Sequence, residues 1–273
     1  MALFKLGLIG GGVMGEALLS RLLDQNLYGA SEVLVSEPQV QRRDFLMNQY
    51  GIATTANNLE AIQATEALLL AIKPQIFSTL ATELASLEQS SAGIASGIVI
   101  SILAGVTLAQ LETAFPRRPV IRVMPNTPAT VGAGISAIAP GTLVQPPHLL
   151  LAKQIFATVG DVVEVPEYLM DAVTGLSGSG PGYVAVFIEA LTDGGVAAGL
   201  PRAIAMQLAL QTVRGTAELL LQSGLHPAEL KDRVTSPGGT TIAGIAQLEQ
   251  AGFRSALIEA VKTACERSRE LGR

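Results

Sequence analysis

Short apolar runs alternate with longer amphipathic stretches from Phe4 to about Val165. The runs are four to six residues long, end at turn-forming residues and are apolar at nearly every position, which is typical of parallel strands buried on both faces. The stretches between them have apolar residues at helical spacing. The pattern therefore predicts a sheet of βαβ units, with strands at 4–9, 33–36, 67–72, 98–102 and 120–124 and helices at 14–25, 40–49, 58–64, 77–86 and 108–114.

The pattern changes after about Glu167, where strand-like runs stop and helical patterns take over. Proline in the first turn and glycine after the last turn mark several helix ends. The expected helices are 181–199, 201–223, 227–233, 240–251 and 253–270. We therefore expect two domains, 1–165 with the sheet and 166–273 with helices only, which agrees with a length of 273 residues at roughly 100–200 residues per domain.

The composition is that of a chain with a large apolar core. Apolar residue types make up 49% and charged types 15%, which excludes a disordered chain because burial can offset the lost conformational entropy. The longest nearly uncharged apolar stretch is shorter than the ~20 residues of a membrane-spanning helix, so we expect no membrane segment. Aromatic residues are only 4%, and the remaining apolar surface is expected to be covered partly by subunit contacts in an obligate oligomer.

Charge and the reactive residue types exclude several kinds of partner. The formal net charge of −5 argues against nucleic acid and anionic membranes, which require clustered lysine and arginine. Cys265 is the single cysteine, which excludes an intramolecular disulfide, and His148 and His226 stand too far apart in sequence to predict a metal site. The first residues lack the regions of a signal peptide, so we expect a cytoplasmic protein.

A glycine-rich motif, GGGVMG at 10–15, follows the first predicted strand and opens the first predicted helix. It fits the GxGxxG fingerprint, in which Gly10 allows the tight turn, Gly12 lets the backbone approach a diphosphate and Gly15 lets the helix pack against the strand. An acidic residue, Glu37, follows 22 positions after the last glycine. We interpret the motif as a dinucleotide-binding site rather than as a simple glycine-rich turn.

Two further segments follow the ends of predicted strands, where a parallel sheet binds its ligands. The first, AIKP at 71–74, presents Lys73, either beside a cofactor or as a solvated lysine in a loop. The second, MPNTP at 124–128, presents Asn126 and a hydroxyl between two stiff prolines. This second segment suits a contact to nicotinamide or substrate, and an Asx-type turn is the alternative.

Two glycine-rich segments precede predicted helices in the second domain. The segment GLSGSGPG at 175–182 has more glycines than helix capping requires, so it either lines a site or only caps the helix. The segment SPGGTT at 236–241 combines backbone amides at a helix start with the hydroxyls of Thr240 and Thr241. We favour a site for a small carboxylate here over plain N-capping, because capping explains one hydroxyl but not the glycine pair.

The reaction class is indicated by what the sequence lacks. Oxidation of a hydroxy acid needs a general base, usually histidine or lysine. No lysine lies between Lys153 and Lys231, and neither histidine falls in a glycine-rich motif. A reductase whose substrate is already electrophilic, such as a protonated imine, needs mainly orientation and a carboxylate clamp while the cofactor donates the hydride.

In this order, the motifs resemble those of the pyrroline-5-carboxylate reductases, the last enzymes of proline biosynthesis, and the resemblance runs essentially from end to end. It rests on GGGVMG at 10–15, AIKP at 71–74, AGVT at 104–107, MPNTP at 124–128, GLSGSGP at 175–181, LKD at 230–232 and SPGGTT at 236–241. The resemblance implies an α/β fold, with an N-terminal Rossmann domain followed by an all-helical C-terminal dimerisation domain. It also implies dimers that often assemble into decamers, with an active site between the cofactor cleft and the C-terminal helices, to which helices of the second subunit contribute.

The resemblance also implies roles for single residues. The residues implied to bind NADPH or NADH are Gly10, Gly12, Val13 and Met14 at the diphosphate, Asn58 near the adenosine ribose, Ala71, Lys73 and Pro74 past the nicotinamide ribose, and Asn126 beside the nicotinamide. The residues implied to hold the substrate carboxylate are Ser236, Gly238, Gly239, Thr240 and Thr241. Thr241 is the expected catalytic residue, with its hydroxyl facing the ring nitrogen. Gly182 departs from the alanine that the family's pattern has at this position.

Cofactor choice is left open by a second departure. Glu37 stands where the family's pattern predicts serine or threonine, and an acidic side chain there accepts hydrogen bonds from the adenosine ribose and repels a 2′-phosphate. Arg42 and Arg43 follow within the next helical turns, and the guanidinium of either could bind that phosphate. The alternatives are that these arginines lie on a solvated helix face, or that one of them pairs with Glu37. We expect both cofactors to be used, with NADPH disfavoured by Glu37.

The sequence thus predicts NAD(P)H-dependent reduction of 1-pyrroline-5-carboxylate to L-proline by hydride transfer to the cyclic imine. Two alternatives stay open: a related imine or 3-hydroxyacid oxidoreductase, and a nonenzymatic dinucleotide-binding regulator. The missing lysine argues against the hydroxyacid dehydrogenase. The complete loop at 236–241 argues against the regulator, because a sensor of the cofactor alone needs no anion site.

Overall fold

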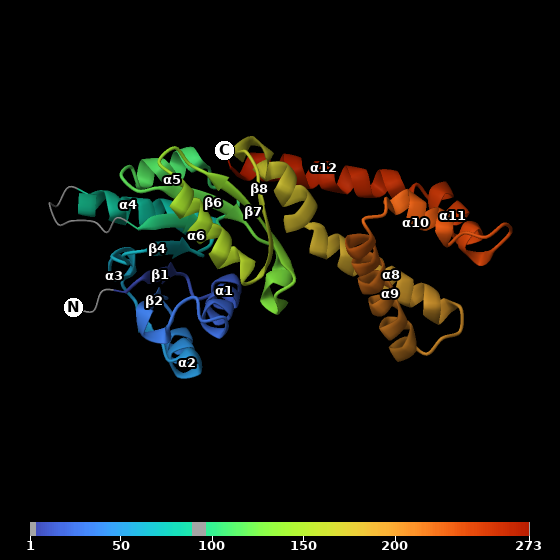
Figure 1. The fold of residues 1–273 in the computed structure, drawn as a ribbon, viewed down its shortest axis with the longest axis horizontal. Helices are drawn as coiled ribbons and strands as arrows, with labels where there is room; N and C mark the ends of the chain where they lie inside the picture. Colours follow the sequence, from blue (N-terminus) through green and yellow to red (C-terminus); the bar gives the residue numbers. More distant parts are fainter. Residues whose placement is uncertain (1–3, 89–96, 273) are drawn as a thin grey trace. The chain divides into compact units, whose positions relative to one another are not determined.

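The computed structural model describes residues 4–88 and 97–272, whose contacts divide the chain into two compact units (Figure 1). The sheet unit is formed by the described residues up to Gly178 and from Ala264 onward, and the helical unit by residues 179–263. The chain therefore leaves the sheet unit once and returns to it near its end.

Among the described residues, eight strands form one sheet in the order β3-β2-β1-β4-β5-β6-β7-β8. Neighbouring strands pair in parallel, except that β7 runs antiparallel to β6. The strands β1, β2, β4 and β5 are buried at every position, as their unbroken apolar pattern predicts. The strand bounds are β1 Leu6–Ile9, β2 Val33–Ser36, β3 Ala53–Thr55, β4 Ala67–Leu70, β5 Ile98–Ser101, β6 Val120–Met124, β7 Gly134–Pro140 and β8 Gly160–Glu164.

Two apolar clusters form the core of the sheet unit. One cluster includes Leu18 of α1 and Phe156 of α6, and the other includes Ile62 of α3 and Leu111 of α5; all four side chains are fully buried. Helices thus cover the sheet and bury its apolar strands. The helices of this unit are α1 Val13–Asp24, α2 Val40–Tyr50, α3 Asn58–Ile62, α4 Phe77–Glu88, α5 Leu108–Ala114, α6 Pro146–Ala157 and α7 Met170–Val173, with short 3-10 turns η1 Ala30–Glu32, η2 Pro74–Ile76, η3 Thr127–Val131 and η4 Glu167–Leu169 and a π-turn η5 Thr174–Gly178.

The structure contains every strand and helix that the sequence predicts, with ends that differ by a few residues. The prediction was incomplete, because β3, β7, β8, α6 and the four-residue helix α7 were missed. β3 has three half-buried residues, β7 contains glycine, serine and proline, and β8 is an edge strand with acidic residues, so none has an unbroken apolar run. α6 begins with two prolines, which are compatible with the first turn of a helix but resemble a loop in sequence.

The helical unit is built around a pair of long helices, α8 and α9, which pack against each other. Two contacts tie α8 to α12: the rings of Phe187 and Phe253 lie 5.9 Å apart, and the Tyr183 hydroxyl donates to the Ala260 carbonyl at 3.3 Å. The helices are α8 Gly180–Ala197, α9 Arg202–Ser223, α10 Pro227–Arg233, α11 Thr240–Gln250 and the larger part of α12 Phe253–Leu271.

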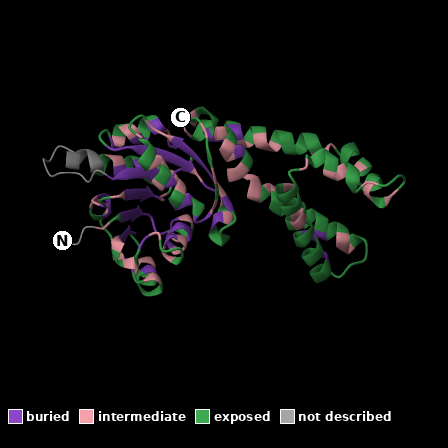
Figure 2. Cartoon of the chain, in the orientation of Figure 1, coloured by how far each residue is buried: buried purple, intermediate pink, exposed green. Residues whose placement is uncertain are grey.

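Burial differs sharply between the two units. The strands of the sheet unit are mostly purple in Figure 2, whereas the helical unit is mainly green and pink. Within residues 179–263, only Thr192, Ala205 and Ala209 are buried. Helices whose apolar residues remain this exposed need a further surface to cover them. None of the described helices combines the length and apolar character needed to cross a membrane.

The division by contacts differs from the expected boundary between residues 165 and 166. Residues 167–178 belong to the sheet unit, where Met170 is fully buried in the core. The chain from Ala264 onward also belongs to the sheet unit, although it ends a helix that begins in the helical unit. Helical periodicity predicts which face of a helix is apolar but not which unit covers that face.

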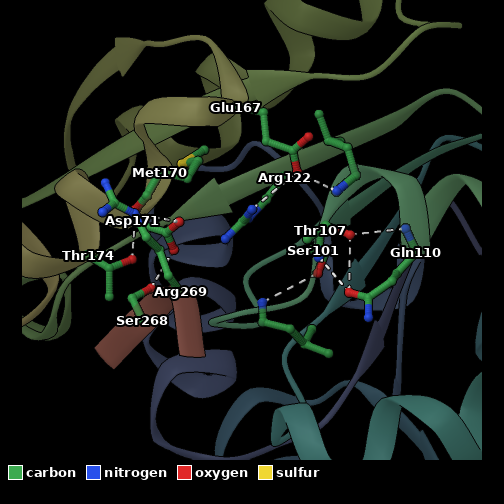
Figure 3. A network of polar contacts seen from close by, with 12 residues as sticks. Ser101, Thr107, Gln110, Arg122, Glu167, Met170, Asp171, Thr174, Ser268 and Arg269 are labelled. Carbon is green, nitrogen blue, oxygen red and sulfur yellow. Dashed lines mark hydrogen bonds and ion pairs between the residues drawn. The ribbon is translucent and has the colours of Figure 1, made fainter. Parts of the chain in front are cut away.

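A network of polar contacts holds these segments on the sheet unit (Figure 3). Arg122 on β6 forms an ion pair with Glu167 at 3.1 Å, and the same carboxylate oxygen accepts the Leu108 backbone N–H at 2.5 Å. The Ser268 hydroxyl near the end of α12 donates to Asp171 at 2.7 Å. Glu167 therefore anchors the outgoing segment beside β6 and α5, and Ser268 ties the end of α12 to Asp171 on α7.

We expect Glu167→Ala to lower the free energy of unfolding by about 1–3 kcal/mol. The substitution removes the carboxylate that pairs with Arg122, whose side chain is 8% exposed. It also removes the acceptor of the Leu108 N–H. Urea denaturation at fixed protein concentration measures the change. Glu164→Ala is the matched control, since the Lys153–Glu164 pair is 42% and 44% exposed, and should change stability by under about 0.5 kcal/mol. Equal effects of the two substitutions would contradict this account.

Candidate functional site

The glycine loop joins the end of β1 to the start of α1 and passes very close to β4. Gly10 has a φ of +103°, and a Cβ at this position would lie 2.6 Å from the Ala71 carbonyl oxygen. A Cβ at Gly15 would collide with the Gly10 carbonyl oxygen. Only glycine is tolerated at these two positions, as the fingerprint predicts.

The loop leaves open space over the start of α1. Gly12 is the N-cap residue, no side chain caps this end of the helix, and nothing lies within 4 Å of the position that a Gly12 Cβ would take. Gly12 and Val13 are exposed, and Met14 is half-buried. The first backbone N–H groups of α1 and the positive end of its dipole therefore face a space that an anionic diphosphate can fill.

Glu37 lies immediately after β2 and contacts the glycine loop. Its Oε2 accepts the Gly11 backbone N–H at 3.0 Å, and its Oε1 accepts the Gln39 backbone N–H at 3.0 Å. The residue is only 8% exposed. The structure therefore places this carboxylate against the glycine loop, and backbone amides rather than arginines hold it there.

Arg42 and Arg43 are not free side chains on a solvated helix face. Arg42 donates from Nε to the Gly11 carbonyl at 2.6 Å and forms an ion pair with Glu16 on α1. Arg43 donates from Nη1 to the backbone carbonyl of Glu37 at 2.8 Å. Both arginines thus pack against the segments that surround the dinucleotide site.

Asn58 begins α3 and lies beside the end of β2. Its Oδ1 accepts the hydroxyl of Ser36 at 2.8 Å, and its Nδ2 donates to Glu83 at 3.1 Å. Because Ser36 directly precedes Glu37, the structure brings Asn58 to the same strand end as the acidic residue, as expected for a residue near the adenosine ribose.

The segment that follows β4 runs past the other side of the glycine loop. The Ala71 N–H donates to the Ile9 carbonyl at 2.8 Å, which fixes this segment beside β1. Lys73 is exposed at the N-cap of η2, and Pro74 opens that turn. The structure therefore brings Ala71, Lys73 and Pro74 to the strand edge that carries the glycine loop.

Asn126 uses both ends of its amide inside the protein. Its Oδ1 accepts the Ile135 N–H at 2.9 Å, and its Nδ2 donates to the Ser177 carbonyl at 3.2 Å. The side chain therefore connects the end of β6 to β7 and to the π-turn, where a carbonyl is released from regular helical bonding. The GLSGSGPG segment begins in this turn, so its first part is anchored to the sheet unit.

The SPGGTT segment lies on the helical unit and leads into α11. The Gly239 N–H donates to the Ser236 carbonyl at 3.0 Å, and Gly238 has a φ of +66°. Gly239 is the N-cap residue and no side chain caps the helix, so the alternative of plain capping by serine or threonine is wrong. Thr240 is exposed and Thr241 half-buried, beside the open amides of the first turn.

Two residues beside the dinucleotide site, Glu16 and Tyr50, are not predicted from the sequence. Glu16 follows the last glycine of the loop and pairs with Arg42, and it accepts the Tyr50 hydroxyl at 2.7 Å. An acidic residue directly after the GxGxxG motif was the only signal in the sequence. Among the described residues, no group of three or more histidine, cysteine, aspartate or glutamate side chains could hold a metal ion.

A glycine loop between the first strand and helix of a mostly parallel sheet, with an acid at the end of β2, defines a Rossmann-type dinucleotide-binding oxidoreductase. Family models agree: an NADP oxidoreductase, coenzyme F420-dependent model matches residues 5–105, and a pyrroline-5-carboxylate reductase dimerisation model matches residues 167–271. The pyrroline-5-carboxylate reductase of Synechocystis sp. is 58% identical over 98% of both chains. The chain belongs to the pyrroline-5-carboxylate reductase family.

Solved structures of the family have the same fold. A pyrroline-5-carboxylate reductase from Coxiella burnetii superimposes with a TM-score of 0.89 at 31% identity over 100% of both chains. A pyrroline carboxylate reductase from Plasmodium falciparum, solved with NADP bound, superimposes with a TM-score of 0.87 at 31% identity over 99% of this chain and 98% of that one. The predicted fold class, an α/β Rossmann domain followed by a helical dimerisation region, is confirmed.

Gly12→Ala should weaken binding of NADPH and NADH at least about tenfold, because the added methyl group would occupy the space that the diphosphate needs. The methyl group meets no protein atom within 4 Å, so the free energy of unfolding should stay within about 1 kcal/mol of the parent. Titration of cofactor fluorescence together with urea denaturation separates the two effects. Gly10→Ala is the comparison, since it should lose stability as well. An unchanged dissociation constant for Gly12→Ala would place the diphosphate elsewhere.

Proposed function

We infer that this chain catalyses the reduction of 1-pyrroline-5-carboxylate to L-proline, with NADPH or NADH as hydride donor. The observation that carries this inference is 58% identity to the Synechocystis reductase over nearly the whole chain. The glycine loop at the start of α1 and the open first turn of α11 support it independently. A 3-hydroxyacid dehydrogenase and a nonenzymatic regulator have no comparable support.

The sheet unit is the proposed cofactor-binding part. The amides at the start of α1 would hold the diphosphate, with Gly12 leaving room for it. Glu37 and Asn58 would face the adenosine ribose, and the segment of Ala71, Lys73 and Pro74 would run past the nicotinamide ribose. We propose that Asn126 contributes by fixing the backbone at the end of β6, because its amide is already bonded at both ends.

The segment 236–241 is the proposed carboxylate site. It contains no lysine or arginine, so the first-turn amides of α11 and the threonine hydroxyls would carry the binding. The positive φ of Gly238 and the bond from the Gly239 N–H to the Ser236 carbonyl hold the turn in shape. A carboxylate bound here would fix the orientation of the pyrroline ring.

The reaction then needs little proton transfer from the protein. Reduced nicotinamide, when bound, supplies a hydride, which adds to the carbon of the C=N bond while the π electrons move to nitrogen. If the imine enters protonated, the proton already on nitrogen remains in the product amine. Thr241 is the proposed catalytic residue, because its hydroxyl can hydrogen-bond the ring nitrogen as its charge changes.

Thr241→Ala should lower kcat/KM for 1-pyrroline-5-carboxylate about ten- to hundredfold, equivalent to about 1.5–3 kcal/mol for a hydrogen bond to a charged group. Oxidation of NAD(P)H, followed by absorbance, measures the rate, and a hydroxy acid with NAD(P)+ tests the alternative reaction. Thr216→Ala is a matched control, because the Thr216 hydroxyl bonds the Thr212 carbonyl within α9. Wild-type kinetics in Thr241→Ala would remove this residue from the mechanism.

The helical unit is the proposed dimer interface. The dimerisation model matches residues 167–271, which agrees with a functional division into 1–165 and 166–273 rather than with the division by contacts. Residues exposed on these helices include Val186 at 65% and Leu221 at 77%. We propose that a second copy covers this surface and that dimers assemble further into a decamer.

Sedimentation velocity at micromolar concentration should therefore give a dimer or a larger assembly and no folded monomer. Leu208→Glu, at a position 53% exposed on α9, should weaken the dimer because it places a charge in the covered surface. Leu143→Glu is the control, at a position 47% exposed on the sheet unit and outside the dimerisation model. Folded wild-type monomers at this concentration would refute the proposed interface.

Other proposed properties follow from the sequence and stay predictions. The proposed residence is the cytoplasm. We propose no nucleic-acid or membrane partner, because the net charge of −5 is unfavourable for both. The small-molecule partners are the cyclic imine and the reduced dinucleotide, and no step requires a metal.

A further inference from the structure

The carboxylate of Glu37 cannot easily turn away from the ribose end of the dinucleotide site. Each of its oxygens accepts one backbone N–H at 3.0 Å, from Gly11 and from Gln39, and the residue is 8% exposed. Rotation of the side chain would leave the buried Gly11 N–H without its acceptor and would also break the bond from the exposed Gln39. Each carboxylate oxygen keeps a second lone pair, which can accept a ribose hydroxyl.

Arg42, the nearest candidate for a phosphate, is held in place by other groups. Its Nε donates to the Gly11 carbonyl at 2.6 Å, its Nη2 pairs with Glu16, and its guanidinium carbon lies 4.9 Å from the centre of the Phe45 ring. Together these contacts hold the guanidinium against the glycine loop and α1. The charge of Arg42 is already balanced by Glu16.

Arg43 is also engaged. Its Nη1 donates to the backbone carbonyls of Glu37 and Pro38, each at 2.8 Å. A further carboxylate, that of Glu83, accepts a hydrogen bond from Asn58 at 3.1 Å. Around the end of β2, the groups positioned to meet an extra phosphate thus include two carboxylates and two arginines that already have partners.

Glu16 is itself fixed by a second partner. The Tyr50 hydroxyl donates to Glu16 Oε1 at 2.7 Å, while Arg42 pairs with the other oxygen. Burial alone would raise the pKa of the Glu16 carboxyl, but the hydrogen bonds from Arg42 and Tyr50 outweigh it and lower this pKa below its ordinary value. Burial and the neighbouring carboxylate raise the pKa of Tyr50 to about 12. At neutral pH Glu16 is therefore an anion that retains Arg42, and Tyr50 stays a donor.

We propose that Glu37 makes this chain select NADH over NADPH, and that Glu16 is a positioning residue that keeps Arg42 away from a 2′-phosphate. The inference rests on the proposed function only in that a nicotinamide dinucleotide occupies the sheet unit with its adenosine ribose at the end of β2. NADH presents a 2′-hydroxyl, which can donate to Glu37. NADPH presents a phosphate with up to two negative charges, which meets a carboxylate that cannot withdraw.

Binding of NADH and of NADPH, each without substrate, tests the proposal. Isothermal titration should give a dissociation constant at least about tenfold lower for NADH in the wild type. Glu37→Ser and Glu37→Gln should each shift the NADH-to-NADPH ratio toward NADPH by about tenfold or more. The glutamine variant retains the side-chain shape and one acceptor. It therefore tests the effect of the Glu37 charge on cofactor choice even if the serine variant folds poorly.

Glu32→Gln is the matched control. Glu32 also accepts a backbone N–H, that of Gly29 at 2.8 Å, and pairs with Lys5 at 2.6 Å, but it lies in η1, before β2 begins. Neutralising it changes the net charge by the same amount and should leave the cofactor ratio unchanged. If net charge alone decided the binding of the more anionic cofactor, Glu32→Gln and Glu37→Gln would shift the NADH-to-NADPH ratio equally. That result would overturn the role of Glu37.

Glu16→Ala tests the role of the positioning residue. Without its partner, the Arg42 guanidinium can reach a 2′-phosphate, so NADPH binding should strengthen about three- to tenfold while NADH binding changes little. The gain should disappear in Glu16→Ala/Arg42→Ala, because it depends on Arg42. If NADPH binding is still strengthened in the double variant, or is not strengthened in Glu16→Ala, the proposed role of Glu16 is overturned.

The two proposals fail in distinguishable ways. If the wild type binds NADPH as tightly as NADH, or if the Glu37 variants leave the ratio unmoved, the selection proposal is wrong even when the chain reduces 1-pyrroline-5-carboxylate. If the chain fails to reduce this imine with either cofactor, the proposed function is wrong, and the binding ratios still report on Glu37 and Glu16.

Discussion

The close passage of the glycine loop against β4 is the constraint on which the site depends. A single side-chain carbon at Gly10 would lie 2.6 Å from the Ala71 carbonyl oxygen, and one at Gly15 would collide with the loop itself. With hydrogen at both positions, α1 starts at the edge of the sheet and directs its unpaired amides outward. The segments after β2 and β4 then flank the helix terminus, because β1 lies between those two strands.

Parallel pairing of the strands places the other segments of the site at the same edge of the sheet as the glycine loop. The strands β1, β2, β4, β5 and β6 run in the same direction, so the residues that follow them meet at one edge. β7 and β8 are the exceptions: β7 returns antiparallel to β6 and begins beside that edge, and β8 runs parallel to β7. Asn126 lies at this reversal of the chain: it accepts the Ile135 N–H on β7 and donates to the Ser177 carbonyl in the π-turn, and so joins the end of β6 to both segments.

The sequence predicts the elements that are buried on both faces and the glycines that a close approach requires. It does not predict β7 or β8, whose residues are small, polar or half-exposed and gain their strand conformation from pairing with neighbours. The same limit applies inside the site. Glu37 could be placed from its spacing, whereas the contacts of Arg42 with Glu16 and with Gly11 depend on how α2 packs on α1. Partner choice between distant polar groups is a tertiary property that a linear pattern does not contain.

The two units differ in where their stabilisation comes from. The sheet unit buries its apolar strands under its own helices, so it has a core within one chain. The helical unit buries only Thr192, Ala205 and Ala209 among residues 179–263, and its long helices present leucine and valine to solvent. Such helices do not gain enough from intrachain packing to offset the entropy of ordering them. In the proposed dimer a second copy would complete the core of this unit, and the order of the proposed carboxylate loop on α11 would then depend on assembly.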